Sequence, residues 1–156
     1  MPEKPIKLTQ EEAERDPETK RLLLNLKKVF KKYIQKRDKF KCVLSGEARN
    51  IDVSHFLGVA GSKNERLAYD PRNAHIMAKR LHKMYHECNP LPYVRYMINT
   101  YGQDVVDQME QDSKRYYRLT RDEIISLTND LVARTKKLGD IKRWNESNSK
   151  KKVEDE

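Results

Sequence analysis

The chain is poor in the residues that stabilise secreted proteins and in the long apolar runs that cross membranes. Its 156 residues include two cysteines, Cys42 and Cys88, which are too few for a disulfide framework and fit a reducing compartment. No apolar run approaches the roughly 20 residues that span a bilayer. The first 19 residues lack the apolar segment of a signal peptide. We therefore expect a cytoplasmic protein that has no membrane partner.

Acidic residues are almost absent from one segment near the N-terminus. Residues 20–41 contain ten Lys or Arg side chains and a single acid, Asp38. The formal net charge of the whole chain is +9, and a charge excess concentrated in one element is typical of proteins that bind a polyanion, most often nucleic acid. A charge run can also be a solvated helix face, so charge alone leaves both interpretations open.

Apolar residues recur at helical spacing in several segments, which predicts a mainly helical α+β fold. A stripe of apolar side chains from Leu22 to Ile34 predicts an amphipathic helix over 20–37. Residues 42–73 contain glycines and short alternations of apolar and polar positions, which predict a hairpin with a long loop. Further helices are expected in three segments: 78–88, 94–101 and 105–109.

The last predicted helix carries signals at both ends. Thr120 and Glu123 have the spacing of a capping box, and Gly139 stands where a C-terminal cap is expected. The length of the chain suggests one domain. We predict three parts: a flexible segment over 1–19, a single domain over 20–139, and a polar, disordered tail over 140–156.

All four histidines fall within one stretch of the chain: His55, His75, His82 and His86. His82 and His86 are four residues apart in a predicted helix, so their side chains project from the same face. Two imidazoles at this spacing can bind one divalent metal ion. The pair could equally be two surface histidines, because such motifs also arise by chance. His75 is expected to support the metal site or to be a hydrogen-bonded packing residue.

The residues upstream of the pair favour the metal site. His55 lies in the alternating segment IDVSHF, a glycine-containing loop follows, and Asn73 stands nine residues before His82. This order of strand, loop, Asn and helix resembles the HNH, or ββα-metal, nuclease motif, and the added His86 resembles the arrangement in colicin-type DNases. The resemblance implies a ββα-metal core with flanking helices, and a metal-dependent endonuclease that hydrolyses phosphodiester bonds.

The predicted roles follow from the chemistry of phosphodiester hydrolysis. An attacking water must lose a proton, which the neutral imidazole of His55 can accept. One divalent ion, Mg²⁺ or Mn²⁺, held by His82 and His86 would act as the Lewis acid beside the phosphate. Asn73 either braces the loop that carries His55 or binds the metal, and both roles stay open. Asp52 is a candidate third ligand, although a strand-end role is as well supported.

Four segments narrow the resemblance to one family. VFKKYIQKRDKFKCVLSG, DVSHF, LAYDPRNAH and YVRYMINTYGQDVV follow one another over about residues 28–110, in the order and spacing of the phage NinG/Rap recombination nucleases. The resemblance implies activity on branched DNA, such as D-loops or Holliday junctions, in the host cytoplasm. Recombination proteins and a second copy of the chain are further candidate partners.

One departure from the family pattern concerns zinc. Similar zinc-supported HNH proteins have two C-x-x-C knuckles, where this chain has Cys42 with Ser45 and Ala78 with Leu81. A structural zinc needs about four N or S ligands, so no structural zinc is expected. We predict that Ala78 and Leu81 fill this space by apolar packing, helped by the basic helix.

Basic side chains are predicted to contact the DNA backbone, which gives affinity and salt dependence but does not read sequence. They are Lys27, Lys28, Lys31, Lys32, Lys36, Arg37, Lys79, Arg80 and Lys83. Two alternatives stay open: a non-catalytic DNA-binding module on an HNH scaffold, and a sequence-specific homing or restriction-type HNH nuclease. The second usually needs an extra reading element, which a helix-turn-helix in the last helices could supply.

Overall fold

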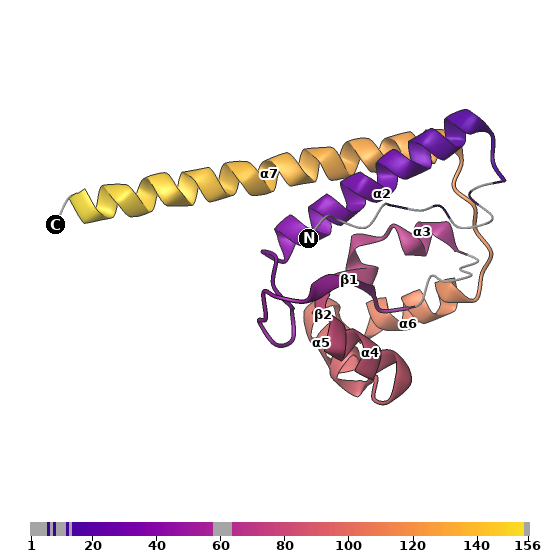
Figure 1. The fold of residues 1–156 in the computed structure, drawn as a ribbon, viewed down its shortest axis with the longest axis horizontal. Coiled ribbons are helices and arrows are strands. Elements are labelled where there is room, and N and C mark those ends of the chain that lie inside the picture. The colour runs from indigo at the N-terminus through magenta and orange to yellow at the C-terminus, as the bar shows by residue number, and fades with distance from the viewer. Residues whose placement is uncertain (1–5, 7, 9–11, 13, 58–63, 155–156) are drawn as a thin grey trace.

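The computed structural model describes residues 6, 8, 12, 14–57 and 64–154. Within these ranges it has six α-helices and one two-stranded sheet (Figure 1), which confirms the predicted mainly helical α+β class. None of the described helices is long and apolar enough to cross a membrane. The elements are α2 Pro17–Arg37, β1 Ile51–His55, α3 Glu65–Ala68, the 3-10 helix η1 Pro71–Asn73, β2 Ala74–Ala78, α4 Lys79–Glu87, α5 Leu91–Tyr101, α6 Gln103–Ser113 and α7 Arg121–Glu154.

The two strands form an antiparallel hairpin whose register fixes the site. Ile51 pairs with Ala78 at one end and His55 pairs with Ala74 at the other. Helix α4 begins directly after β2, so the predicted order of strand, strand and helix is present. The role of this unit as a metal core stays a prediction. The register brings the end of β1 next to Asn73, although 17 residues separate Asn73 from Phe56 and 18 separate it from His55.

The sheet lies between two hydrophobic clusters. Ile76 of β2 belongs to the first cluster, with Leu26 of α2 and Ile124 of α7. The next residue, Met77, belongs to the second cluster, with Tyr93 of α5. Successive side chains of a strand point to opposite faces, and this alternation lets one short strand serve both clusters.

Apolar packing fills the place of the missing zinc knuckles. Cys42 and Ala78 are buried in the second cluster and Leu81 packs against it, which confirms the predicted packing. The core residues of α2, by contrast, belong to the first cluster. The predicted help from the basic helix is therefore wrong, because the sheet lies between that helix and the knuckle positions. The absence of a structural zinc stays a prediction.

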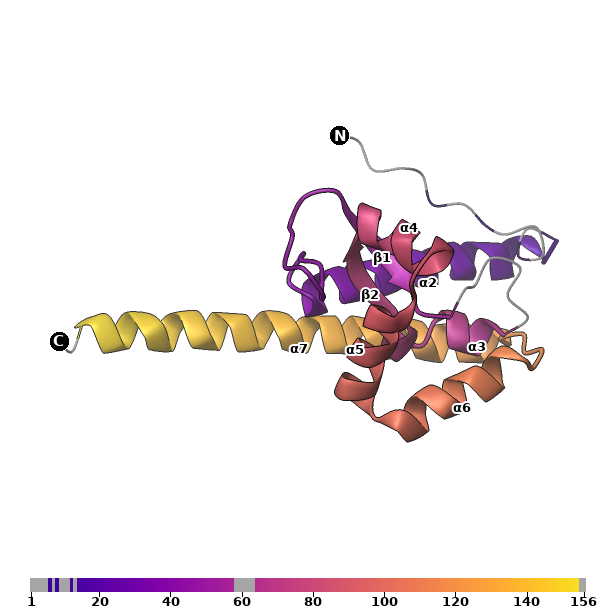
Figure 2. The ribbon, with the colours of Figure 1, turned by 90° about the horizontal axis from the view of Figure 1, so that it is seen from below.

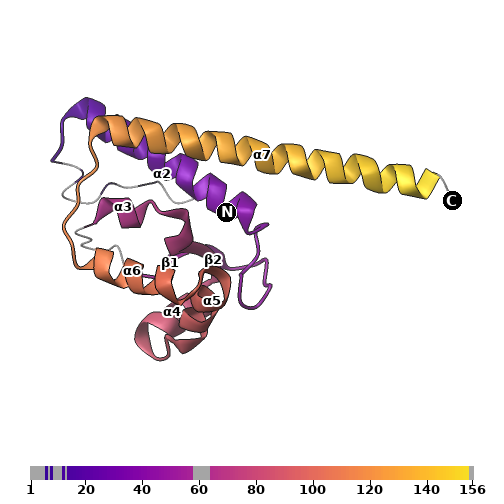
Figure 3. The same cartoon turned by 180° about the vertical axis from the view of Figure 1, so that it is seen from behind.

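Helices α2 and α7 lie side by side and cover one face of the rest of the domain (Figures 1 and 3). Helix α2 begins at Pro17, earlier than the predicted residue 20, because the Asp16 carboxylate accepts a hydrogen bond from the Thr19 backbone N–H (3.1 Å). The predicted flexible segment 1–19 therefore overlaps this helix, and most of residues 1–13 lie outside the described residues.

Helix α7 starts as predicted and ends later than predicted. The Glu123 N–H donates to Thr120 Oγ1 (3.2 Å) and the Thr120 N–H donates to Glu123 Oε1 (3.3 Å), which confirms the capping box. The helix then passes through Gly139 to Glu154, beyond the rest of the molecule (Figure 2). The predicted end at Gly139 is wrong, because an internal glycine costs a helix only about 1 kcal/mol relative to alanine and no proline follows it.

Candidate functional site

His55 stands at the end of β1 with one ring nitrogen already bonded. Its half-buried ring stacks on Phe30 of α2, with centroids 6.1 Å apart and planes 9° apart. Nε2 lies 2.9 Å from the Ala68 carbonyl oxygen, and because a carbonyl only accepts, Nε2 carries a hydrogen. In the neutral ring Nδ1 is then the proton acceptor. The geometry therefore fixes the tautomer that a base acting through Nδ1 requires.

The surroundings of His55 favour its neutral form. Burial lowers the pKa of His55, and the nearby His82, Lys27 and His86 lower it further, while the bond to Ala68 acts in the opposite direction. An imidazole with a pKa below about 6.5 is mostly uncharged at neutral pH. His55 is thus able to accept a proton at the pH of a cell.

Asn73 braces the chain that follows His55. Its fully buried amide accepts from the Leu57 N–H (2.9 Å) and donates to the carbonyls of Leu57 (3.3 Å) and Leu67 (3.2 Å). The Phe56 N–H also donates to the backbone carbonyl of Asn73 (2.8 Å). These contacts fit the bracing role. The alternative role as a metal ligand has no geometric support, because the amide is buried among backbone groups.

His82 and His86 lie next to each other on α4. Their ring centroids are 4.7 Å apart, His82 is half-buried and His86 is exposed. Burial lowers the pKa of His82, His86 lowers it further, and Asp52 opposes the shift. Asp52 is exposed on β1 and accepts from the Val53 N–H (2.9 Å). Both histidines thus lie close enough to His55 to affect its pKa, and Asp52 lies close enough to His82 to affect that of His82.

The donor set suits a loosely held ion. Among the side chains of residues 12, 14–57 and 64–139, no three His, Cys, Asp or Glu are grouped as metal ligands. His82 and His86 would therefore provide two protein ligands, with Asp52 nearby. Mg²⁺ and similar ions usually keep several waters and bind substrate phosphate oxygens in their remaining positions. Imidazoles suit transition-metal ions, whereas Mg²⁺ prefers oxygen ligands. The pair therefore fits a divalent transition-metal ion, and Mg²⁺ would rely on Asp52, water and phosphate oxygens.

His75 is the centre of a buried network that reaches the site. Tyr93 donates its hydroxyl hydrogen to the Ser54 carbonyl (3.2 Å), so it accepts from His75 Nδ1 (3.0 Å). Tyr101 lies 2.8 Å from Nε2 and donates to it. Burial lowers the pKa of His75 to about 4, and Arg37 adds to this shift. His75 therefore supports the residue that precedes His55, and sequence reasoning missed both tyrosines, whose only signal is a spacing of about two turns on α5.

The predicted DNA-binding side chains do not form one uniform surface. Arg37 donates to the carbonyls of Pro71 (2.6 Å) and Ala74 (2.5 Å). Its guanidinium therefore holds β2 in place and is not available to the DNA surface. Lys27 pairs with Glu12 (2.7 Å), and the exposed Arg80 pairs with Glu47. The remaining side chains are exposed or, for Lys31, half-buried: Lys28, Lys31, Lys32, Lys36, Lys79 and Lys83.

Comparison with known proteins places the chain in a family. Searches of curated proteins and of solved structures each found no match. A family model described as Bacteriophage Lambda NinG protein matches residues 9–141. This range contains both strands, helix α4 and all four histidines, and it exceeds the range 28–110 over which the sequence motifs suggested the same family. The chain therefore belongs to the NinG family.

Proposed function

We propose that this NinG-family chain is a metal-dependent DNA endonuclease, with His55 as the base and His82 and His86 as metal ligands. The observation that carries the proposal is the grouping of three imidazoles on two adjoining elements. The His82 and His86 ring centroids lie 4.7 Å apart on α4, and α4 contacts β1, whose last residue is His55. Two imidazoles that can bind a metal ion, beside a third that can accept a proton, suit the hydrolysis of a negatively charged ester.

The chain's own residues would perform the proton transfer. His55 Nδ1 accepts a proton from the attacking water as the new oxygen–phosphorus bond forms, and the Ala68 carbonyl keeps the resulting imidazolium in place. The bond to the leaving oxygen then breaks, and solvent water protonates that oxygen. A divalent ion bound by His82 and His86 would supply positive charge to the phosphate. Asn73 maintains the position of His55 through its bonds to Leu57.

Basic residues flank the histidines on the same helix. Lys79 and Lys83 are exposed on α4, where they would neutralise phosphates beside the scissile bond. These contacts give no sequence readout, so they support a substrate selected by DNA shape. The proposed substrate is branched DNA of the kind formed in recombination, and this part of the proposal rests on the family.

A cleavage assay with a panel of substrates tests the proposal. The purified chain is incubated with linear duplex, single strand, D-loop and four-way junction, with Mn²⁺, with Mg²⁺ and with EDTA. We expect cleavage that requires a divalent ion and is faster on the branched substrates. Binding without cleavage of any substrate would instead favour a non-catalytic DNA-binding module, and cleavage at one fixed sequence would favour the homing or restriction-type alternative.

A further inference from the structure

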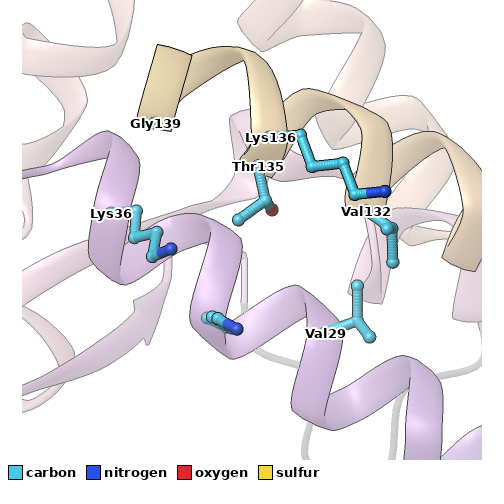
Figure 4. A pocket seen from close by; sticks show the side chains of 7 residues that line it. Val29, Lys36, Val132, Thr135, Lys136 and Gly139 are labelled. Carbon is cyan, nitrogen blue, oxygen red and sulfur yellow. The ribbon is translucent and has the colours of Figure 1, made fainter. Parts of the chain in front are cut away.

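A groove between α2 and α7 carries positive charge on both of its walls. It has a volume of about 450 Å³. Lys32 and Lys36 contribute from α2, and Lys136 contributes from α7 (Figure 4). None of the seven lining residues is acidic. The sequence patterns grouped Lys32 and Lys36 with the other lysines of their helix and gave no role to Lys136.

The three lysines have no anionic partner among the described residues. None of them takes part in the ion pairs or side-chain hydrogen bonds of residues 14–57 and 64–139, whereas Lys27 on the same helix is paired with Glu12. Three like charges around one groove repel each other, and a polyanion seated between them relieves that repulsion. Charge complementarity therefore points to an anionic occupant.

Part of the groove lining is apolar. Val29 and Val132 line it from the two helices, and Val132 is 37% exposed. The Thr135 hydroxyl donates to the Leu131 carbonyl (2.7 Å), so the lysines supply the remaining side-chain donors of the groove lining. A groove lined by both lysines and apolar side chains matches a nucleic-acid strand, which presents phosphates beside sugars and bases.

The groove and the histidines lie on different faces of α2. Phe30 contacts the ring of His55. Successive helical residues turn by about 100°, so Val29, Lys32 and Lys36 lie about 100–160° around the helix from Phe30. A strand in the groove is therefore a different stretch of nucleic acid from the one at His55.

We infer that the α2–α7 groove is a second DNA-binding site, which holds the sugar–phosphate backbone away from the bond that is cut. This inference rests on the proposed function for the identity of the polyanion. It adds Lys136 of α7 to the DNA-binding surface, and it means that the chain contacts two separate stretches of its substrate.

The salt dependence of DNA binding tests the inference, measured by fluorescence anisotropy with EDTA present so that no cleavage occurs. Each phosphate contact contributes about one unit to the slope of log K against log salt concentration. We expect Lys136→Ala to lower the slope by about one unit and Lys32→Ala/Lys36→Ala to lower it by about two. Lys137→Ala is the matched control, because Lys137 is the exposed neighbour that does not line the groove.

Gly139 allows a second test that removes no lysine. A Cβ added at Gly139, at the end of the groove, meets no atom within 4 Å, so larger side chains fit there. Gly139→Glu should weaken DNA binding, whereas Gly139→Gln, of nearly the same size, should bind more tightly than the Glu variant. Equal binding by the Glu and Gln variants would contradict the inference.

The outcomes separate this inference from the proposed function. Equal slopes for Lys136→Ala and Lys137→Ala would overturn the groove as a DNA site even if the wild type cleaves DNA. A smaller salt dependence for Lys136→Ala, with that of Lys137→Ala unchanged, would support the groove as a DNA-binding site even if no substrate is cleaved. A wild type that binds no DNA would overturn both.

Discussion

His55 combines a fixed tautomer with a reduced basicity, and each has a separate structural cause. The Ala68 carbonyl holds the hydrogen on Nε2. Burial and the neighbouring His82 lower the pKa of the ring. A base must be uncharged to accept a proton, so a lower pKa widens the pH range in which His55 is active, while it also makes the ring a weaker base.

The pH profile of cleavage should report this lowered pKa. At saturating Mn²⁺ the rate should stay constant from pH 8 to below about 6.5, the ordinary pKa of histidine, and should fall only at lower pH. Single-turnover cleavage across this range measures the profile, and doubling the Mn²⁺ concentration at each pH checks that metal loss is not limiting. An inflection above pH 6.5 would contradict the account of His55.

Metal dependence should distinguish His82 from His86. His82 is half-buried and interacts with Asp52, whereas His86 is exposed one turn further along α4, where water can replace it. We expect His82→Ala to lose nearly all cleavage, and His86→Ala to need more Mn²⁺ for half-maximal cleavage while keeping activity at saturation. Lys83→Ala, on the same helix, should need the same Mn²⁺ concentration as the wild type for half-maximal cleavage. Identical Mn²⁺ titrations for all these proteins would make the pair ordinary surface histidines.

His75 should make the stability of the protein depend on pH. Its pKa is about 4 in the fold and about 6.5 in an unfolded chain. The unfolded chain therefore binds more protons between these values, so stability is full above about pH 6.5 and falls towards pH 4, by about 3 kcal/mol in total. Urea unfolding of wild type and His75→Gln at pH 7 and pH 4.5 measures this. Parallel losses in the two proteins would show that other groups are responsible.

At the scale of elements, residues close together in the sequence predicted where helices begin and end. Contacts between distant residues could not be predicted in this way. The capping box of α7 and the end of α5 at residue 101 depend on residues a few positions apart, and the structure has both. The network of His75 joins residues 18 and 26 positions away, which no local pattern reveals. Gly139 misled the prediction of the helix end, because glycine is common after helices and also tolerated within them.

Arg37 illustrates a basic residue whose role depends on such distant contacts. Its guanidinium bonds to the carbonyls of Pro71 in η1 and Ala74 in β2 and to the Asp38 carboxylate. That carboxylate also accepts from the Ile76 N–H (2.8 Å). It was predicted from charge to bind DNA. The contacts instead join the end of α2 to the strand that precedes α4.

Arg37→Lys should therefore destabilise the fold. A lysine cannot form the planar set of hydrogen bonds that Arg37 makes, and hydrogen bonds to charged groups contribute about 1.5–3 kcal/mol each, so we expect a loss of about 2–3 kcal/mol. The neighbouring exposed Lys36→Ala should change stability by less than about 0.5 kcal/mol. Urea unfolding compares the two, and a loss of similar size in both would contradict this role for Arg37.

At the scale of the whole molecule, the sheet lies between the paired helices α2 and α7 and the smaller helices α4, α5 and α6 (Figures 1 and 2). Sequence patterns predicted the helical class and the order of the ββα unit. They did not predict that α7 would pair with α2, because the packing of two helices 100 residues apart leaves no signal in either one. The pairing places lysines of both helices around one groove.

The central claim is that His55 is the base of a DNA endonuclease. It is tested most directly by His55→Ala, with single-turnover cleavage of a four-way junction in Mn²⁺ and binding of the same junction in EDTA measured side by side. The account predicts that cleavage falls by at least about 100-fold, as expected for loss of a general base, while affinity and its salt dependence stay near the wild-type values. Wild-type cleavage by His55→Ala would contradict the account.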